Sequence, residues 1–107
     1  MPEVSNILAG IPLQLPEELS TCLMQQANVR IERIVSRGHA SAKSEWYDQA
    51  QDEWVILMRG AATLEFAGQT ELTRLQAGDY LLIPAHCRHR VEWTDPDNDS
   101  IWLAVHF

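Results

Sequence analysis

From Val29 to the end of the chain, short apolar and β-branched segments alternate with glycine, aspartate and proline. The helical spacing of about 3.6 residues is absent there, and short runs that end at such breakers are typical of strands. The predicted strands are Val29–Ser36, Glu53–Arg59, Ala61–Phe66, Glu71–Leu75, Tyr80–Ile83, His89–Trp93 and Ser100–Phe107. Short antiparallel strands at this spacing bury two apolar faces and hide their edges in a jelly-roll β-barrel. The sequence therefore predicts an all-β fold. An immunoglobulin-type sandwich is the alternative, but this sequence lacks the Cys-Trp-Cys pattern of that fold.

The residues before Val29 are predicted to form an N-terminal arm. Pro16 and the two acidic residues after it are a favourable helix start, which predicts a short helix from Leu15 to about Gln25. The chain of 107 residues has room for one domain. We therefore expect an arm with a short helix over residues 1–28 and a β-barrel over residues 29–107.

The charge of the chain limits its partners. Eight Lys and Arg against fifteen Asp and Glu give a net charge of -7, which repels phosphate backbones and anionic lipid surfaces. No apolar run approaches the roughly twenty residues that cross a bilayer. The two cysteines, Cys22 and Cys87, lie far apart without an apolar signal segment. We expect no nucleic-acid partner, no membrane partner, and a reduced, cytoplasmic setting.

Two motifs lie within the predicted barrel. Glu53 stands seven residues before Gly60, and Gly78, Pro84 and His89 follow in order, with five residues between the glycine and the proline. Glycine and proline set turns at the two ends of a strand, and the histidine begins the next strand. These residues resemble the two conserved motifs of the cupin superfamily, and the second motif is the more specific. The resemblance implies a small single-domain cupin with a jelly-roll β-barrel.

The resemblance also implies a site at one mouth of the barrel. Metal-binding cupins gather two histidines and a glutamate from the first motif and one histidine from the second. Glu53 and His89 match this pattern, whereas the two first-motif histidines are missing. With a four-residue gap before Glu53, Asp48 is the residue that could replace one of them. This register implies a divalent ion (zinc, manganese, iron or nickel) on Asp48, Glu53 and His89, with an apoprotein without metal as the alternative.

The residues around this set are expected to bind a ligand. With the four-residue gap the other histidine is replaced by Trp46, which cannot ligate a metal, and with a three-residue gap Tyr47 and Gln49 take both places. The adjacent Trp46 and Tyr47 could form an aromatic platform for a sugar-like ligand. His86 stands where the family usually has glycine, and it either turns into the site or caps a turn at the surface. The predicted ligand-binding residues are Trp46, Tyr47, Gln49 and His86.

Three functional classes remain open at this stage. The chain could be a metal-dependent enzyme, a module that binds a small polar or sugar-like ligand, or a structural protein with a filled barrel. The missing histidines favour the second and third classes. The sequence shows no Ser-His-Asp order, glycine-rich phosphate loop or CxxC pair, which leaves nucleophilic catalysis and nucleotide binding without support. An apolar-rich chain with an arm too short for its own core also predicts a homodimer.

Overall fold

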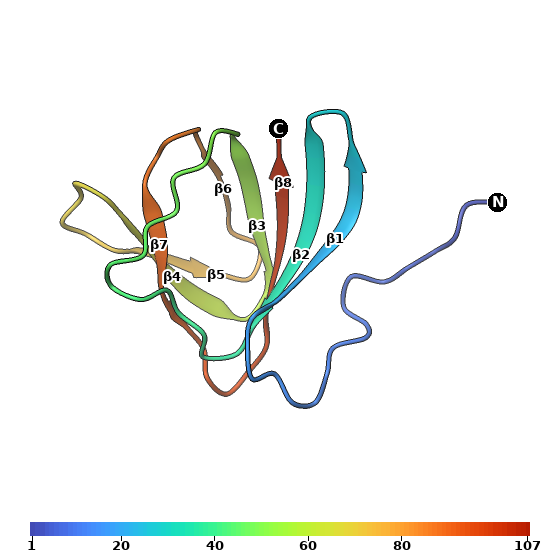
Figure 1. Cartoon of the computed structure of the whole chain (residues 1–107). Coiled ribbons are helices and arrows are strands. Elements are labelled where there is room, and N and C mark those ends of the chain that lie inside the picture. The colour runs from blue at the N-terminus through green and yellow to red at the C-terminus, as the bar shows by residue number, and fades with distance from the viewer.

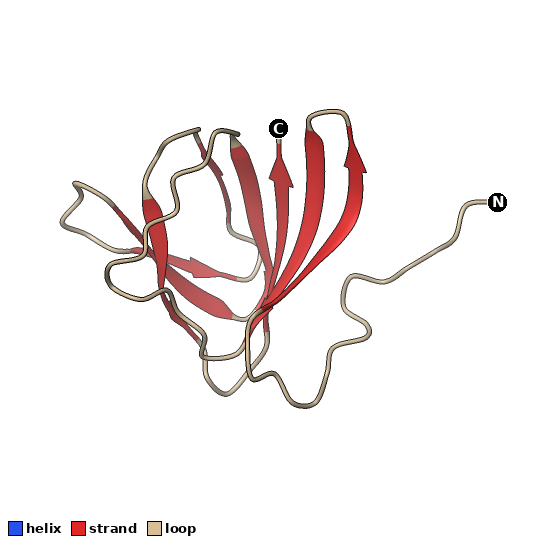
Figure 2. Ribbon diagram, viewed as in Figure 1, coloured by secondary structure: helices blue, strands red, loops and turns tan.

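The computed structural model describes all 107 residues and contains eight strands and no helix (Figures 1 and 2). The strands pair in two antiparallel sheets, with the order β1-β2-β8-β3-β6 in one and β5-β4-β7 in the other. The predicted all-β jelly-roll fold is therefore confirmed. The bounds are β1 Leu19–Gln26, β2 Val29–Ser36, β3 Glu53–Arg59, β4 Ala61–Phe66, β5 Thr73–Gln76, β6 Tyr80–Ile83, β7 His89–Thr94 and β8 Ser100–His106.

The predicted helix from Leu15 to Gln25 is wrong. Leu19–Gln26 is strand β1, which pairs with β2 through a two-residue turn in which Ala27 has a φ of 50°. A helix of this length is marginal in isolation, and the backbone hydrogen bonds offered by β2 outweigh the local start signal of Pro16. The first sheet therefore begins at Leu19. Every strand predicted from Val29 onward is present, and only the ends of β5, β7 and β8 differ.

The core lies between the two sheets, where strand alternation places the inward side chains. On β3 the inward residues Glu53, Val55 and Leu57 are buried, while the residues between them are only half-buried. The inward row thus runs from an acidic residue at the start of the strand into the apolar core. The buried core cluster consists of Val55, Leu57, Ala62, Leu64, Leu75, Ile83, Trp102 and Ala104.

The N-terminal arm contacts the first sheet at strand β2. Arg33 of β2 is 8% exposed, and its guanidinium Nη1 donates to the carbonyl oxygens of Ile7 at 3.3 Å and Ala9 at 2.6 Å. The side chains of Met1 and Val4 near the start of the arm are fully exposed. The arm is therefore held to the sheet by its backbone. The structure contains no helix with the length and apolarity that a membrane crossing requires.

Strands β3 and β6 carry exposed apolar side chains on the outer face of the first sheet. Tyr80 is 65% exposed and Leu82 is 53% exposed, and both lie on β6 opposite residues of β3. Trp54, the partner of Leu82, packs its ring against Tyr80 with 5.5 Å between the ring centroids. Such a face is typical of a surface that another subunit covers. The homodimer stays a prediction.

Candidate functional site

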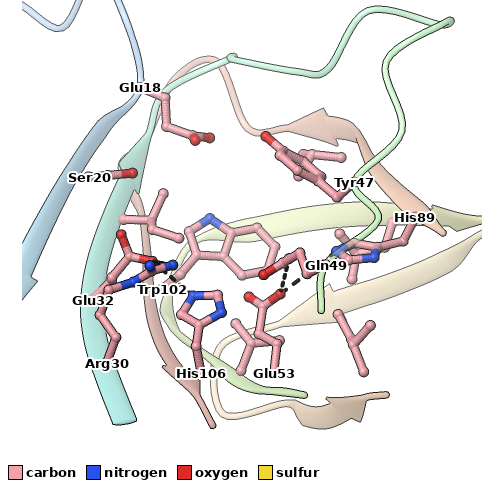
Figure 3. A pocket seen from close by; sticks show the side chains of 15 residues that line it. Glu18, Ser20, Arg30, Glu32, Tyr47, Gln49, Glu53, His89, Trp102 and His106 are labelled. Atoms are coloured by element: carbon pink, nitrogen blue, oxygen red, sulfur yellow. Dashed lines mark hydrogen bonds and ion pairs between the residues drawn. The ribbon is translucent and has the colours of Figure 1, made fainter. Parts of the chain in front are cut away.

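A cavity of about 300 Å³ opens between the two sheets (Figure 3). Its polar residues come from β1, β2, β3, β7 and β8, from the residue before β1 and from the loop before β3, so that both sheets contribute to it. The rest of its wall is formed by apolar side chains that continue into the core. These are Ile34, Val55, Leu64, Ile83, Val91 and Trp102.

Glu53 and His89 face each other inside this cavity, as the motifs predict. Glu53 is 8% exposed and His89 is 5% exposed, and Oε1 of the glutamate lies 3.8 Å from Nε2 of the histidine. Nδ1 of His89 lies 2.8 Å from the carbonyl oxygen of Cys87. Because a carbonyl can only accept, this contact places the ring proton on Nδ1. In its neutral form, His89 therefore presents the unprotonated Nε2 to the cavity.

In the structure, the residues that precede Glu53 with the three-residue gap are the ones that face the cavity. Tyr47 and Gln49 line the cavity, whereas Trp46 and Asp48, which alternate with them, do not. The backbone fixes this phase, because Tyr47 N–H donates to the His89 carbonyl at 2.7 Å and His89 N–H donates back at 3.2 Å. Tyr47 and Gln49 therefore occupy the two places that the cupin resemblance assigns to histidines.

The remaining predicted site residues lie outside the cavity. Asp48 Oδ1 is 2.7 Å from His86 Nδ1, with side chains that are 49% and 70% exposed. His86 has a φ of 61°, a conformation that favours glycine, the usual residue at this place in the family motif. Trp46 lies beneath two guanidinium groups, at 5.6 Å from Arg88 and 6.0 Å from Arg90. Of the predicted metal set, only Glu53 and His89 come together.

The donors that line the cavity do not fit a resident divalent ion. No three His, Cys, Asp or Glu side chains are grouped so that they could hold a metal. Gln49 directs its amide Nε2 toward Glu53 Oε1 at 3.1 Å and so acts as a donor. Burial, together with the negative charges of Glu18, Glu45 and Glu53, raises the pKa of the Tyr47 phenol. A protonated phenol and a donating amide are poor substitutes for two imidazoles.

A second polar cluster lines the cavity and was not predicted. His106 is 4% exposed, and its Nε2 lies 2.8 Å from Glu32 Oε1, which also lies 3.3 Å from Arg30 Nη2. The register explains the grouping, because His106 of β8 stands opposite Arg30 of β2 on one side and Glu53 of β3 on the other. The alternation of β2, which puts Arg30 and Glu32 on the same face as Ile34, was the available signal.

The charges that line the cavity are mainly negative. Three carboxylates (Glu18, Glu32 and Glu53) face one guanidinium (Arg30), and the whole chain carries -7. Glu18 also accepts a hydrogen bond from Ser36 Oγ at 3.0 Å. Charge therefore favours a neutral ligand over an anionic one.

The fold and the motif residues identify the class of protein. Residues 33–106 match the family model described as the cupin domain, and the chain belongs to this family. No curated protein sequence matches the chain. Among solved structures, the chain is 45% identical to a "putative mannose-6-phosphate isomerase" from Ralstonia eutropha JMP134, with a TM-score of 0.94 and coverage of 98% of this chain and 97% of that one.

Two further solved structures share the fold at lower identity. One is a cupin superfamily protein from Desulfitobacterium hafniense DCB-2, with 21% identity, a TM-score of 0.77 and coverage of 100% of this chain and 93% of that one. The other is a cupin 2 conserved barrel domain protein from Salinispora arenicola CNS-205, with 24% identity, a TM-score of 0.70 and coverage of 100% and 88%. At these identities the likeness supports the architecture alone.

Proposed function

We propose that this cupin binds a neutral sugar in the cavity between its sheets, without a resident metal ion. The observation that carries the proposal is the combination of an apolar wall with hydrogen-bonding groups of both kinds around Glu53. A sugar has apolar C–H faces and hydroxyls that donate and accept, so it matches both parts of such a wall. A cavity of about 300 Å³ is at the small end of ligand pockets, which suits a single sugar ring.

The relative from Ralstonia eutropha supports the choice of a sugar. Its name refers to mannose 6-phosphate, and 45% identity over nearly the whole of both chains makes a related ligand reasonable here. The cavity disfavours the phosphate group of this sugar. The three carboxylates of Glu18, Glu32 and Glu53 repel it, and Arg30 is the single guanidinium beside them. We therefore take D-mannose as the first probe.

D-mannose is expected to bind to the purified protein, and mannose 6-phosphate at least tenfold more weakly. One pair of like charges about 8 Å apart at an effective dielectric constant of about 20 repels by about 2 kcal/mol. A tenfold change in affinity corresponds to about 1.4 kcal/mol. Isothermal titration calorimetry of the full chain with both sugars, before and after dialysis against EDTA, measures the two affinities. The affinity for D-mannose should be the same with and without EDTA.

A pair of carboxylate variants controls this titration. Glu53→Gln is expected to weaken mannose binding about tenfold, because it removes a charged acceptor from the cavity. Asp48→Asn should bind as the wild type does, because Asp48 lies outside the cavity beside His86. Tighter binding of mannose 6-phosphate would contradict the charge argument. Mannose binding that requires a divalent ion and is lost in Asp48→Asn would contradict the metal-free site.

Sugar isomerisation is the second candidate function, and the presence of Glu53 and Tyr47 in the same cavity favours it. Glu53 is a buried carboxylate, and burial together with nearby negative charges, that of Glu53 among them, raises the pKa of the Tyr47 phenol. Proton transfer between neighbouring carbons needs a base and an acid that act on the same bound ligand. Glu53 would take the proton from C2 of open-chain mannose, and the C–H electron pair would form the enediol double bond. The carbonyl oxygen would take the phenol proton.

Two further proton transfers, now at C1 and at the C2 oxygen, complete the reaction. Glu53 returns its proton to C1, the C2 hydroxyl gives its proton back to Tyr47, and the product is the ketose. We expect fructose with deuterium at C1 when the protein is incubated with D-mannose in D₂O, measured by NMR. Tyr47→Phe should bind mannose but form fructose at least a hundredfold more slowly, because general acid catalysis contributes about 10² to 10⁴ in rate. Mannose that binds and stays unchanged in D₂O would leave binding as the function.

A further inference from the structure

The cluster of Arg30, Glu32 and His106 is outside both cupin motifs, yet it forms one wall of the cavity (Figure 3). Figure 3 shows Arg30 and Glu32 on the side opposite His89, with His106 and Glu53 between them. Opposite residues on paired antiparallel strands have Cα atoms about 4.5 to 5.5 Å apart. Because Glu53 and His106 are such a pair, both polar regions are within reach of one sugar ring.

This cluster contains buried nitrogen atoms that have no hydrogen-bond partner. They are Nε of Arg30 and both ring nitrogens of His106, although Nε2 of His106 lies 2.8 Å from Glu32 Oε1. The imidazole is more than nine-tenths buried, so bulk water does not satisfy it. Buried polar atoms are nearly always paired in folded proteins. These nitrogen atoms are enclosed by the protein, whereas the side chains of Arg30 and Glu32 are 39% and 18% exposed where they line the cavity, so their remaining hydrogen-bonding capacity is open to a ligand.

The unused groups define the chemistry of the missing partner. The partly exposed Arg30 guanidinium can only donate, and ionised Glu32 can only accept. One hydroxyl that donates to Glu32, next to a second that accepts from Arg30, satisfies both. An anionic group would satisfy the donors but would meet the charges of Glu32 and Glu53. Two hydroxyls on neighbouring carbons therefore fit this wall better than a carboxylate or a phosphate.

We infer that Arg30, Glu32 and His106 form a second subsite, which binds two neighbouring hydroxyls of a neutral sugar while Glu53 and His89 hold the other side of the ring. This inference rests on the proposed function and narrows its ligand class to sugars with an intact vicinal diol. It also assigns a binding role to residues that neither cupin motif includes.

NMR of the full chain with ¹⁵N-labelled histidine separates the two sides of the cavity. Titration with D-mannose should shift the ring signals of both His89 and His106, and should leave those of His86 and His39, which do not line the cavity. Single histidine-to-glutamine variants assign the four signals. A shift of His89 without a shift of His106 would overturn the second subsite and leave the proposed function standing. No shift at either histidine would overturn both.

A comparison of deoxy sugars tests the diol directly. The 2-deoxy, 3-deoxy and 4-deoxy analogues of D-mannose are titrated into wild type and Glu32→Gln. At least one analogue should bind the wild type about tenfold more weakly than mannose does, and Glu32→Gln should bind that analogue and mannose equally. The matched control is Glu65→Gln, which breaks a carboxylate–guanidinium pair with Arg90 at 2.6 Å outside the cavity and should behave as the wild type.

The outcomes of this comparison are decisive in both directions. If Glu32→Gln binds mannose as tightly as the wild type does, or if all three analogues bind like mannose, the subsite is overturned. Should Glu32→Gln fail to fold, Arg30→Gln takes its place, since its side chain is 39% exposed and its loss disturbs the core less. The wild type should then bind the analogue that lacks the hydroxyl bound by Arg30 about tenfold more weakly than mannose. Arg30→Gln should bind that analogue and mannose equally.

Discussion

Gly60→Ala is expected to lower the free energy of unfolding by about 2–5 kcal/mol. A Cβ at this position would lie 2.5 Å from Ser100 Oγ, 2.6 Å from Ser100 Cα and 2.7 Å from the Asp99 carbonyl oxygen. Ser100 cannot yield, because it is fully buried and its hydroxyl donates to the Ala61 carbonyl at 3.1 Å. The φ of +92° adds about 1–2 kcal/mol of strain for a non-glycine residue, and overpacking adds about 1–3 kcal/mol. Urea unfolding measures the loss.

Gly68→Ala is the matched control for this substitution. Gly68 has a similar φ of +83°, but no atom lies within 4 Å of the position of its Cβ. It should therefore lose only the strain of about 1–2 kcal/mol. Equal losses in the two variants would show that the contact with Ser100 is relieved by backbone movement. The difference between the variants thus isolates the close approach of the turn after β3 to the start of β8.

Trp102→Ala should lower the free energy of unfolding by about 3–5 kcal/mol and abolish sugar binding. Trp102 is 5% exposed, lies between Ile34 of β2 and Leu57 of β3 in the sheet, and belongs to both the core and the cavity wall. Removal of a buried Trp side chain loses its transfer free energy and leaves a void that the rigid sheets do not fill. Chemical denaturation and calorimetry with D-mannose measure the two effects.

Trp93→Ala provides the comparison on the other sheet. Trp93 is 43% exposed on β7 and does not line the cavity. Its loss should destabilise by less than about 1.5 kcal/mol, because roughly half of its surface already contacts water. Mannose affinity should stay at the wild-type value. A Trp102→Ala protein that still binds mannose as tightly as the wild type would contradict the placement of the ligand against this wall.

Most strands could be predicted from the sequence because nearby residues determine where each strand begins and ends. Residues such as Gly60, Gly78 and Pro84 end apolar runs by forcing turns, and the runs between them are too short for stable helices. Strand β1 carried no such information. It lies at the edge of its sheet with most side chains exposed, so alternation of burial is weak, and its partner β2 decides its conformation.

The two motif residues of the site could be predicted, but their surroundings could not. Glu53 and His89 each begin a strand, so the phase of the strand fixes their direction. Tyr47 and Gln49 precede β3 in an irregular loop, where spacing alone left two registers open. His106 could face either side of β8 on sequence grounds, and its contact with Glu32 depends on a pairing between strands that are far apart in the chain.

The position of β8 also sets the order in which this protein can assemble during synthesis. It is the last of the eight strands to leave the ribosome, yet it lies in the middle of its sheet between β2 and β3. The β1–β2 hairpin and the β3–β6 pair therefore emerge as separate pieces with unpaired edges, which are prone to non-native pairing. Ser100–His106 joins the two pieces and brings the His106 wall of the cavity with it. A nascent chain that ends before Ser100 has neither a continuous sheet nor a complete binding site.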